Sequence, residues 1–160
     1  MSFARHRGIA NFVLQALCVF LLTIQGVQAM AADADQTSAK ISSATVTLDV
    51  YSGRPNPSWT LSDAVTGELL AKLQVLAPIE REVAEFDGLG YRAVRAELRQ
   101  DGEKIVVSAA RGVVTCERGG RQLHYADTGR QFELWLVNTG SGHAPPDVLR
   151  YVAGEIAAKP

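Results

Sequence analysis

Alternating apolar and polar positions predict a strand over residues 44–51. Val46, Leu48 and Val50 point to one side of an extended chain, and the mostly polar residues between them point to the other. Alternation with a period of two, rich in β-branched residues, is typical of a half-buried strand. The same alternation recurs over residues 91–99, and we expect a second strand there.

Further strands are expected to follow as hairpins. The Asp-Gly pair at residues 101–102 is a strong hairpin turn signal, and residues 104–110 after it are rich in β-branched side chains. Residues 112–116 predict a fourth strand. Beyond a Gly-Gly turn, residues 122–125 predict a short edge strand.

Three segments have the features of helices. Ser62 is a good N-cap for the first, in which apolar residues recur at helical spacing until Pro78 ends the segment. Asp127 or Thr128 is expected to cap a second helix that runs to about Asn138 and is apolar over most of its surface. The third covers residues 147–158, with a proline and an aspartate suited to its first turn.

The order of these elements predicts an α+β domain. Hairpin-linked strands favour a small antiparallel sheet of four to five strands, in the order β-α-β-β-β-α-α, with the three helices packed on one face. The opposite face is expected to be polar, and is either plain solvated sheet, the simpler interpretation, or a docking surface. Its predicted residues are Thr45, Thr47, Asp49, Tyr51, Tyr91, Arg95, Glu97 and Arg99.

The first thirty residues have the layout of a secretory signal peptide. A basic start at residues 5–7 is followed by an apolar run over residues 9–24 and then by small residues. We therefore expect a signal peptide over residues 1–29, cleaved near Ala29–Ala31, and export to the periplasm or the extracellular space. The alternative is a retained membrane anchor, but the run is shorter than the roughly 20 apolar residues that a spanning helix needs.

The remaining chain is expected to form a flexible leader over residues 30–43 and a single globular domain over residues 44–160. Loss of the first segment removes two arginines and leaves a modest acidic excess, which argues against a nucleic-acid partner. It also removes Cys18 and leaves Cys116 alone, so no intramolecular disulfide is possible and a hydrophobic core must stabilise the fold. We expect a monomer with no membrane anchor after cleavage.

The most distinctive segment is Ser52–Trp59, which we call the connector loop. Pro55 and Pro57 fix their own φ angles, restrict the residues before them and lack a backbone N–H, so this loop is expected to be stiff. The simpler interpretation is architectural. The prolines then stiffen the crossing from a strand to a helix, and Trp59 packs against the core.

The second interpretation makes the connector loop a recognition element. Arg54 would contact a protein or an anionic ligand, and Asn56 would fix the orientation of the contact. Tyr51 and Trp59 add residue types that dominate binding hot spots. Both interpretations stay open at the level of sequence.

The sequence contains no recognisable catalytic, metal or cofactor motif. His124 and His143 are the only histidines after cleavage, and together with Cys116 they fall short of the usual four-ligand zinc set. The glycine-rich segment 88–93 precedes a predicted strand rather than a helix, unlike a dinucleotide fingerprint. We therefore expect a non-enzymatic binding module that needs no cofactor. A small secreted inhibitor, or a small hydrolase that uses carboxylates, is the alternative.

Overall fold

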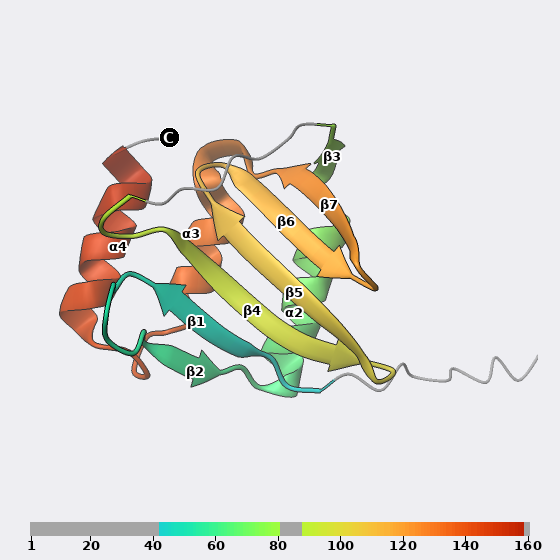
Figure 1. Cartoon of the computed structure of the whole chain (residues 1–160), viewed down its shortest axis with the longest axis horizontal. Coiled ribbons are helices and arrows are strands. Elements are labelled where there is room, and N and C mark those ends of the chain that lie inside the picture. The colour runs from blue at the N-terminus through green and yellow to red at the C-terminus, as the bar shows by residue number, and fades with distance from the viewer. Residues whose placement is uncertain (1–41, 81–87, 159–160) are drawn as a thin grey trace, which may run out of the picture. The chain divides into compact units, whose positions relative to one another are not determined.

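The computed structural model describes residues 42–80 and 88–158. The chain divides into two compact units, Met1–Ser38 and Ala39–Pro160, and every described residue belongs to the second. That unit is built from one antiparallel sheet with helices behind it (Figure 1).

The sheet has seven strands in the described part of the chain, in the spatial order β2-β1-β4-β5-β6-β7-β3. All neighbouring pairs are antiparallel. The strands are β1 Thr45–Asp49, β2 Ser58–Thr60, β3 Ala77–Ile79, β4 Ala93–Gln100, β5 Glu103–Ala110, β6 Val113–Arg118 and β7 Arg121–Ala126.

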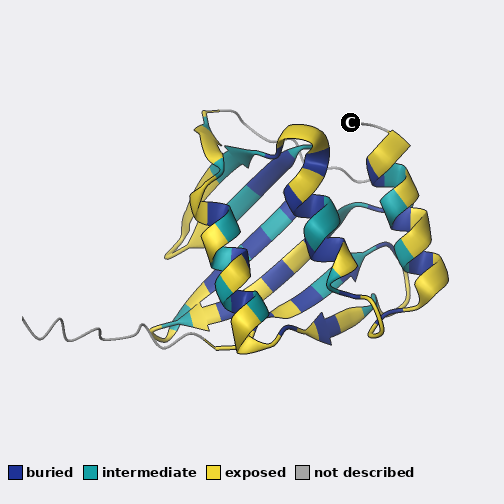
Figure 2. Cartoon of the chain, turned by 180° about the vertical axis from the view of Figure 1, so that it is seen from behind, coloured by how far each residue is buried: buried dark blue, intermediate teal, exposed yellow. Residues whose placement is uncertain are grey.

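Three α-helices in the described ranges pack on one face of this sheet (Figure 2). They are α2 Asp63–Gln74, α3 Gln131–Asn138, which follows a 3₁₀ turn at Thr128–Arg130, and α4 Pro146–Ala158. The predicted N-cap of α2 is confirmed, because the hydroxyl of Ser62 accepts a hydrogen bond from the N–H of Val65 at 3.4 Å. None of the helices in these ranges is long and apolar enough to span a membrane.

The predicted α+β architecture with one antiparallel sheet and three helices is confirmed, but the strand count and the element order were wrong. Two short strands, β2 and β3, were not predicted from the alternation of apolar and polar residues. β2 follows the two prolines of the connector loop, and its Trp59 pairs with Val46 of β1. β3 contains Pro78, which a sheet tolerates at an edge because no neighbour needs its missing N–H. α2 therefore ends before Pro78, with Val75 as its C-cap.

Two residues before β4 also differ from the predicted alternation. Tyr91 is buried rather than on the exposed polar face, and Arg92 lies on that polar face instead of facing the core. The physical reason is that β4 begins only at Ala93. Gly90 has a positive φ of 91°, so the chain bends just before the strand and the period of two does not extend to these positions.

The apolar side chains of the sheet face the helices. One row of paired residues crosses the sheet from Trp59 through Val46, Ala96 and Val107 to Cys116, and all but the last are buried. The helices contribute Leu69, Leu73, Leu136, Val137, Val152 and Ile156 to the same core. Because each fully buried aliphatic side chain of this size contributes about 1.5–3 kcal/mol, this core is the main source of stability.

The predicted signal peptide, residues 1–29, lies outside the described residues, as does most of the predicted leader, residues 30–43. The last leader residue but one, Ser42, is described and contacts the end of β4. Its N–H donates to the carbonyl of Arg99 at 2.9 Å, and its hydroxyl accepts from the N–H of Arg99 at 2.9 Å. Ser42 therefore contacts the sheet, although it falls within the predicted leader.

Candidate functional site

Asn56 holds the connector loop against the end of β1. Its side-chain oxygen accepts hydrogen bonds from the N–H groups of Val50 at 3.0 Å and Tyr51 at 2.8 Å. Its side-chain nitrogen donates to Oδ1 of Asp49 at 3.0 Å. All of these bonds are made within the loop and its root, so Asn56 holds the loop to the end of β1.

Asp49 and Arg92 extend this anchor to the residue just before β4. Arg92 Nε donates to Asp49 Oδ2 at 3.0 Å, Arg92 Nη2 contacts Asp49 Oδ1, and the same Nη2 donates to the carbonyl of Tyr51 at 2.8 Å. The hydrogen bond from Arg92 lowers the pKa of the Asp49 carboxyl below its ordinary value, against the opposing effect of partial burial. The loop is thereby fastened to two strands through one ion pair.

Trp59 closes the loop from the core side. Its ring is 5% exposed, and its Nε1–H donates to Oγ1 of Thr139, just after α3, at 2.9 Å. A Cβ atom added to Gly140 would lie 3.0 Å from this ring, so the glycine allows the close approach. Trp59 is therefore part of the core.

Arg54 and Tyr51 are brought together at the surface. The guanidinium carbon of Arg54 lies 3.5 Å from the centroid of the Tyr51 ring, which is the geometry of a cation–π contact. Arg54 is exposed, and Tyr51 is half-buried. Of the four candidate recognition residues, Arg54 is exposed, Tyr51 and Asn56 are half-buried, and Trp59 is buried.

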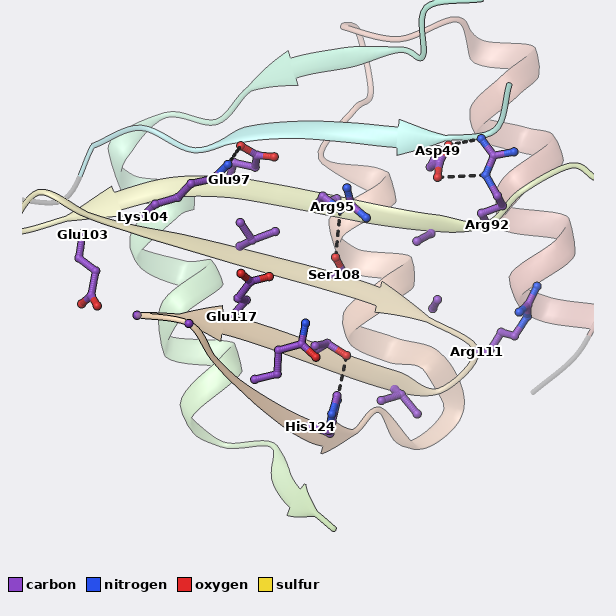
Figure 3. Close-up of a pocket in the computed structure, with 18 residues that line it drawn as sticks. Asp49, Arg92, Arg95, Glu97, Glu103, Lys104, Ser108, Arg111, Glu117 and His124 are labelled. Atoms are coloured by element: carbon purple, nitrogen blue, oxygen red, sulfur yellow. Dashed lines mark hydrogen bonds and ion pairs between the residues drawn. The ribbon is translucent and has the colours of Figure 1, made fainter. Parts of the chain in front are cut away.

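The second candidate surface is the polar face, which we define as the side of β1 and β4–β7 that the described helices leave uncovered. It forms an open hollow of about 1110 Å³ (Figure 3). A single row crosses it in register, from Arg95 through Ser108 and Thr115 to His124. Arg95 Nε donates to the Ser108 hydroxyl at 3.2 Å, and Thr115 Oγ1 lies 3.1 Å from His124 Nδ1.

Charge is distributed unevenly on the polar face. Asp49, Arg92, Arg95 and Arg111 gather at one end of the strands, whereas Glu97, Glu103, Lys104 and Glu117 gather at the other (Figure 3). Asp49 is paired with Arg92, Glu97 with Lys104 at 2.8 Å, and Glu103 with Arg118 at 2.6 Å. Arg95 at the first end and Glu117 at the second lie outside these ion pairs.

A buried polar cluster behind the sheet was missed at the level of sequence. Glu133 is completely buried, and its carboxylate accepts two hydrogen bonds from Arg130, both at 2.8 Å, and one from the Tyr91 hydroxyl at 2.6 Å. Arg130 also donates to the carbonyls of Glu155 and Ile156 in α4, each at 3.3 Å. Burial, reinforced by the Glu133 carboxylate, raises the pKa of Tyr91.

Asp127 completes this cluster by accepting hydrogen bonds from the first turn of α3. Its two carboxylate oxygens accept from the N–H groups of Phe132 and Glu133, each at 2.9 Å. Arg130 between them adopts a left-handed backbone conformation with φ 54°, which is unfavourable for a residue with a side chain. The only available signal was the three-residue spacing of Arg130 and Glu133, and this spacing does not predict burial.

The described residues offer little of what catalysis needs. Thr115 and His124 form a hydroxyl–imidazole pair, but no carboxylate among the described residues orients the imidazole. Burial raises the pKa of the Cys116 thiol and so disfavours its reactive thiolate. In the described ranges no group of three or more His, Cys, Asp or Glu residues is arranged to hold a metal ion.

Comparisons of the chain with protein-family models, with curated proteins and with solved structures found no match.

Proposed function

We propose that this protein is an exported, non-enzymatic binding module and that the connector loop is its recognition element. The observation that carries the proposal is the way this loop is built. Residues at its root are fixed by the Asn56, Asp49 and Arg92 contacts, whereas Arg54 at its tip is exposed and stacked on Tyr51.

A rigid loop with an exposed tip suits binding, because little conformational entropy is lost when the partner associates. The stack on Tyr51 also restricts the otherwise flexible side chain of Arg54. Arginine and tyrosine are among the residue types that dominate binding hot spots. Since a guanidinium forms paired hydrogen bonds with carboxylates and phosphates, the partner is a protein or ligand with an anionic group at this position.

Affinity capture from the exported fraction of the source cells tests this proposal. The exported protein, Arg54→Ala and Arg150→Ala are each immobilised, and the retained molecules are identified. Arg150 is an exposed arginine of α4 in the helical layer, so it is a matched control. We expect Arg54→Ala to lose a partner that the other two retain, at an unchanged melting temperature. Retention of that partner by Arg54→Ala would refute the role of the loop.

The mass of the mature N-terminus tests the exported location separately. A first residue between 30 and 32 is expected if the predicted signal peptide is cleaved near Ala29–Ala31. An intact first segment on the mature protein would contradict export by this route.

A further inference from the structure

We infer that the polar face binds a protein segment of mixed charge, which places a carboxylate over Arg95 and a cationic side chain over Glu117. This inference rests on the proposed binding function but concerns a different surface from the connector loop. It starts from the observation that the described helices cover only one side of the sheet (Figure 2).

Arg95 provides the positive contact. It is exposed, and in the described ranges its side chain forms no ion pair and a single hydrogen bond, from Nε to the Ser108 hydroxyl. The terminal nitrogens of the guanidinium therefore remain to donate to a ligand. Arg92 lies at the same end of the face and is paired with Asp49, whose carboxylate also interacts electrostatically with Arg95. A carboxylate is the complementary group, because it accepts two parallel hydrogen bonds from a guanidinium.

Glu117 provides the negative contact. It is exposed on β6, two residues along from Thr115, which pairs in register with Ser108 and so belongs to the row of Arg95. It makes no ion pair within the described part of the chain, whereas Glu97 nearby is neutralised by Lys104. Strand spacing and residue rise place the Cα atoms of Arg95 and Glu117 roughly 12 Å apart.

This arrangement selects among ligands by charge pattern. A uniform polyanion that bound Arg95 and extended along the face would be repelled by Glu117. A uniform polycation that bound Glu117 would be repelled by Arg95. Only a ligand that carries a negative and a positive group, separated by about the distance between Arg95 and Glu117, forms a favourable contact with each residue. Mixed charge over such a distance is ordinary for the surface of a folded protein or an extended peptide.

The shape of the hollow favours a protein over a small molecule. It is open and spans β1 and β4–β7, with charged and hydroxyl groups over much of its lining. Small-molecule sites are typically concave, mostly apolar and enclose most of the ligand. Protein interfaces, by contrast, are broad and carry polar rims with scattered charges.

Calorimetric titration with synthetic peptides tests this inference on the exported protein. The probes are a peptide with a glutamate block followed by a lysine block, an all-glutamate peptide of equal length, and inorganic phosphate. We expect the block peptide to bind most tightly, and its affinity to fall as salt is added. Arg95→Ala should weaken it about three- to tenfold, and Arg95→Lys less. Glu117→Gln should abolish the preference over the all-glutamate peptide, and Arg150→Ala should change nothing.

Several results would overturn the inference. These are no binding of the block peptide, equal binding of the all-glutamate peptide or of phosphate, and no effect of Arg95→Ala at an unchanged melting temperature. Failure here is distinguishable from failure of the proposed function. The peptide titration depends on Arg95 and Glu117 on the sheet, whereas the capture experiment depends on Arg54 in the connector loop.

Discussion

Glu133 is a carboxylate with no exposed surface, and its neighbours explain how the fold tolerates it. Arg130 supplies the opposite charge in a two-pronged contact, and Tyr91 supplies a further donor. A buried ion is expensive unless its partners satisfy both its charge and its hydrogen bonds. The buried cluster is therefore a position at which single changes have large effects on stability.

Tyr91→Phe removes only the hydroxyl that donates to Glu133. We expect the free energy of unfolding to fall by about 1.5–3 kcal/mol, because a buried charged acceptor loses a hydrogen bond. Urea denaturation measures this change. Tyr125→Phe is the control, since its hydroxyl has no hydrogen-bond partner among the described residues, and it should change the value by less than about 0.5 kcal/mol. Equal values for the two variants would show that the Tyr91 hydrogen bond contributes nothing.

The phenol of Tyr91 also makes the stability of the fold depend on pH in the alkaline range. Burial and Glu133 raise the pKa of Tyr91 in the folded state, so its contribution to stability is complete below the unfolded value of about 10 and is lost as the pH rises above it. In Tyr91→Phe, the loss of unfolding free energy above that pH should therefore be smaller than in the unsubstituted protein.

At the scale of elements, the connector loop separates residues that hold the fold from those that face solvent. Asn56 satisfies two backbone N–H groups at the end of β1 and bonds to Asp49, whereas the exposed Arg54 stacks on the Tyr51 ring. The contacts of Asn56 and Trp59 are those that the architectural interpretation expects, and our proposed recognition role concerns the tip.

Asn56→Ala and Arg54→Ala are expected to differ in stability. The first leaves N–H groups of Val50 and Tyr51 without their acceptor and should lower the free energy of unfolding by about 1–3 kcal/mol. The second loses an exposed cation–π contact and should cost at most about 1 kcal/mol. Thermal and urea unfolding of both variants measure the difference. A larger loss for Arg54→Ala would invert the roles assigned to these residues.

Asp49 makes the root of the loop sensitive to acid. Its folded-state pKa is depressed, chiefly by the hydrogen bond from Arg92, so its contribution is present above the unfolded value of about 4 and is lost as the pH falls through the folded-state pKa. We expect Asp49→Asn to lose less unfolding free energy below pH ~4 than the unsubstituted protein does. Urea denaturation of the two proteins above and below pH ~4 measures the difference, and parallel curves would contradict it.

At the scale of the whole molecule, the fold class could be predicted because the sequences of its main elements show where those elements begin and which of their faces are buried. Val46 and Leu48 alternate with polar neighbours because β1 has one buried face, and Ser62 marks the start of α2 by its capping chemistry. β2 and β3 could not be found this way. Each has three residues, and their pairing with β1 and β7 depends on contacts distant in sequence.

The candidate sites were predicted only in part for a related reason. The exposed pair Arg54 and Tyr51 lies in a segment that its prolines already distinguished. The buried cluster around Glu133 joins the segment just before β4 to α3 and α4, and no local pattern shows that Tyr91 lies against Arg130 and Glu133, which are distant from it in sequence. The charge pattern of the polar face likewise emerges only from the register of β4, β5 and β6.

The most direct measurement is parallel capture from the exported fraction by the unsubstituted protein, Arg54→Ala, Arg95→Ala and Arg150→Ala, at matched melting temperatures. If the protein is a binding module with contacts on the connector loop and the polar face, Arg54→Ala and Arg95→Ala each lose a partner that Arg150→Ala retains. Identical retention by all four proteins would contradict the account.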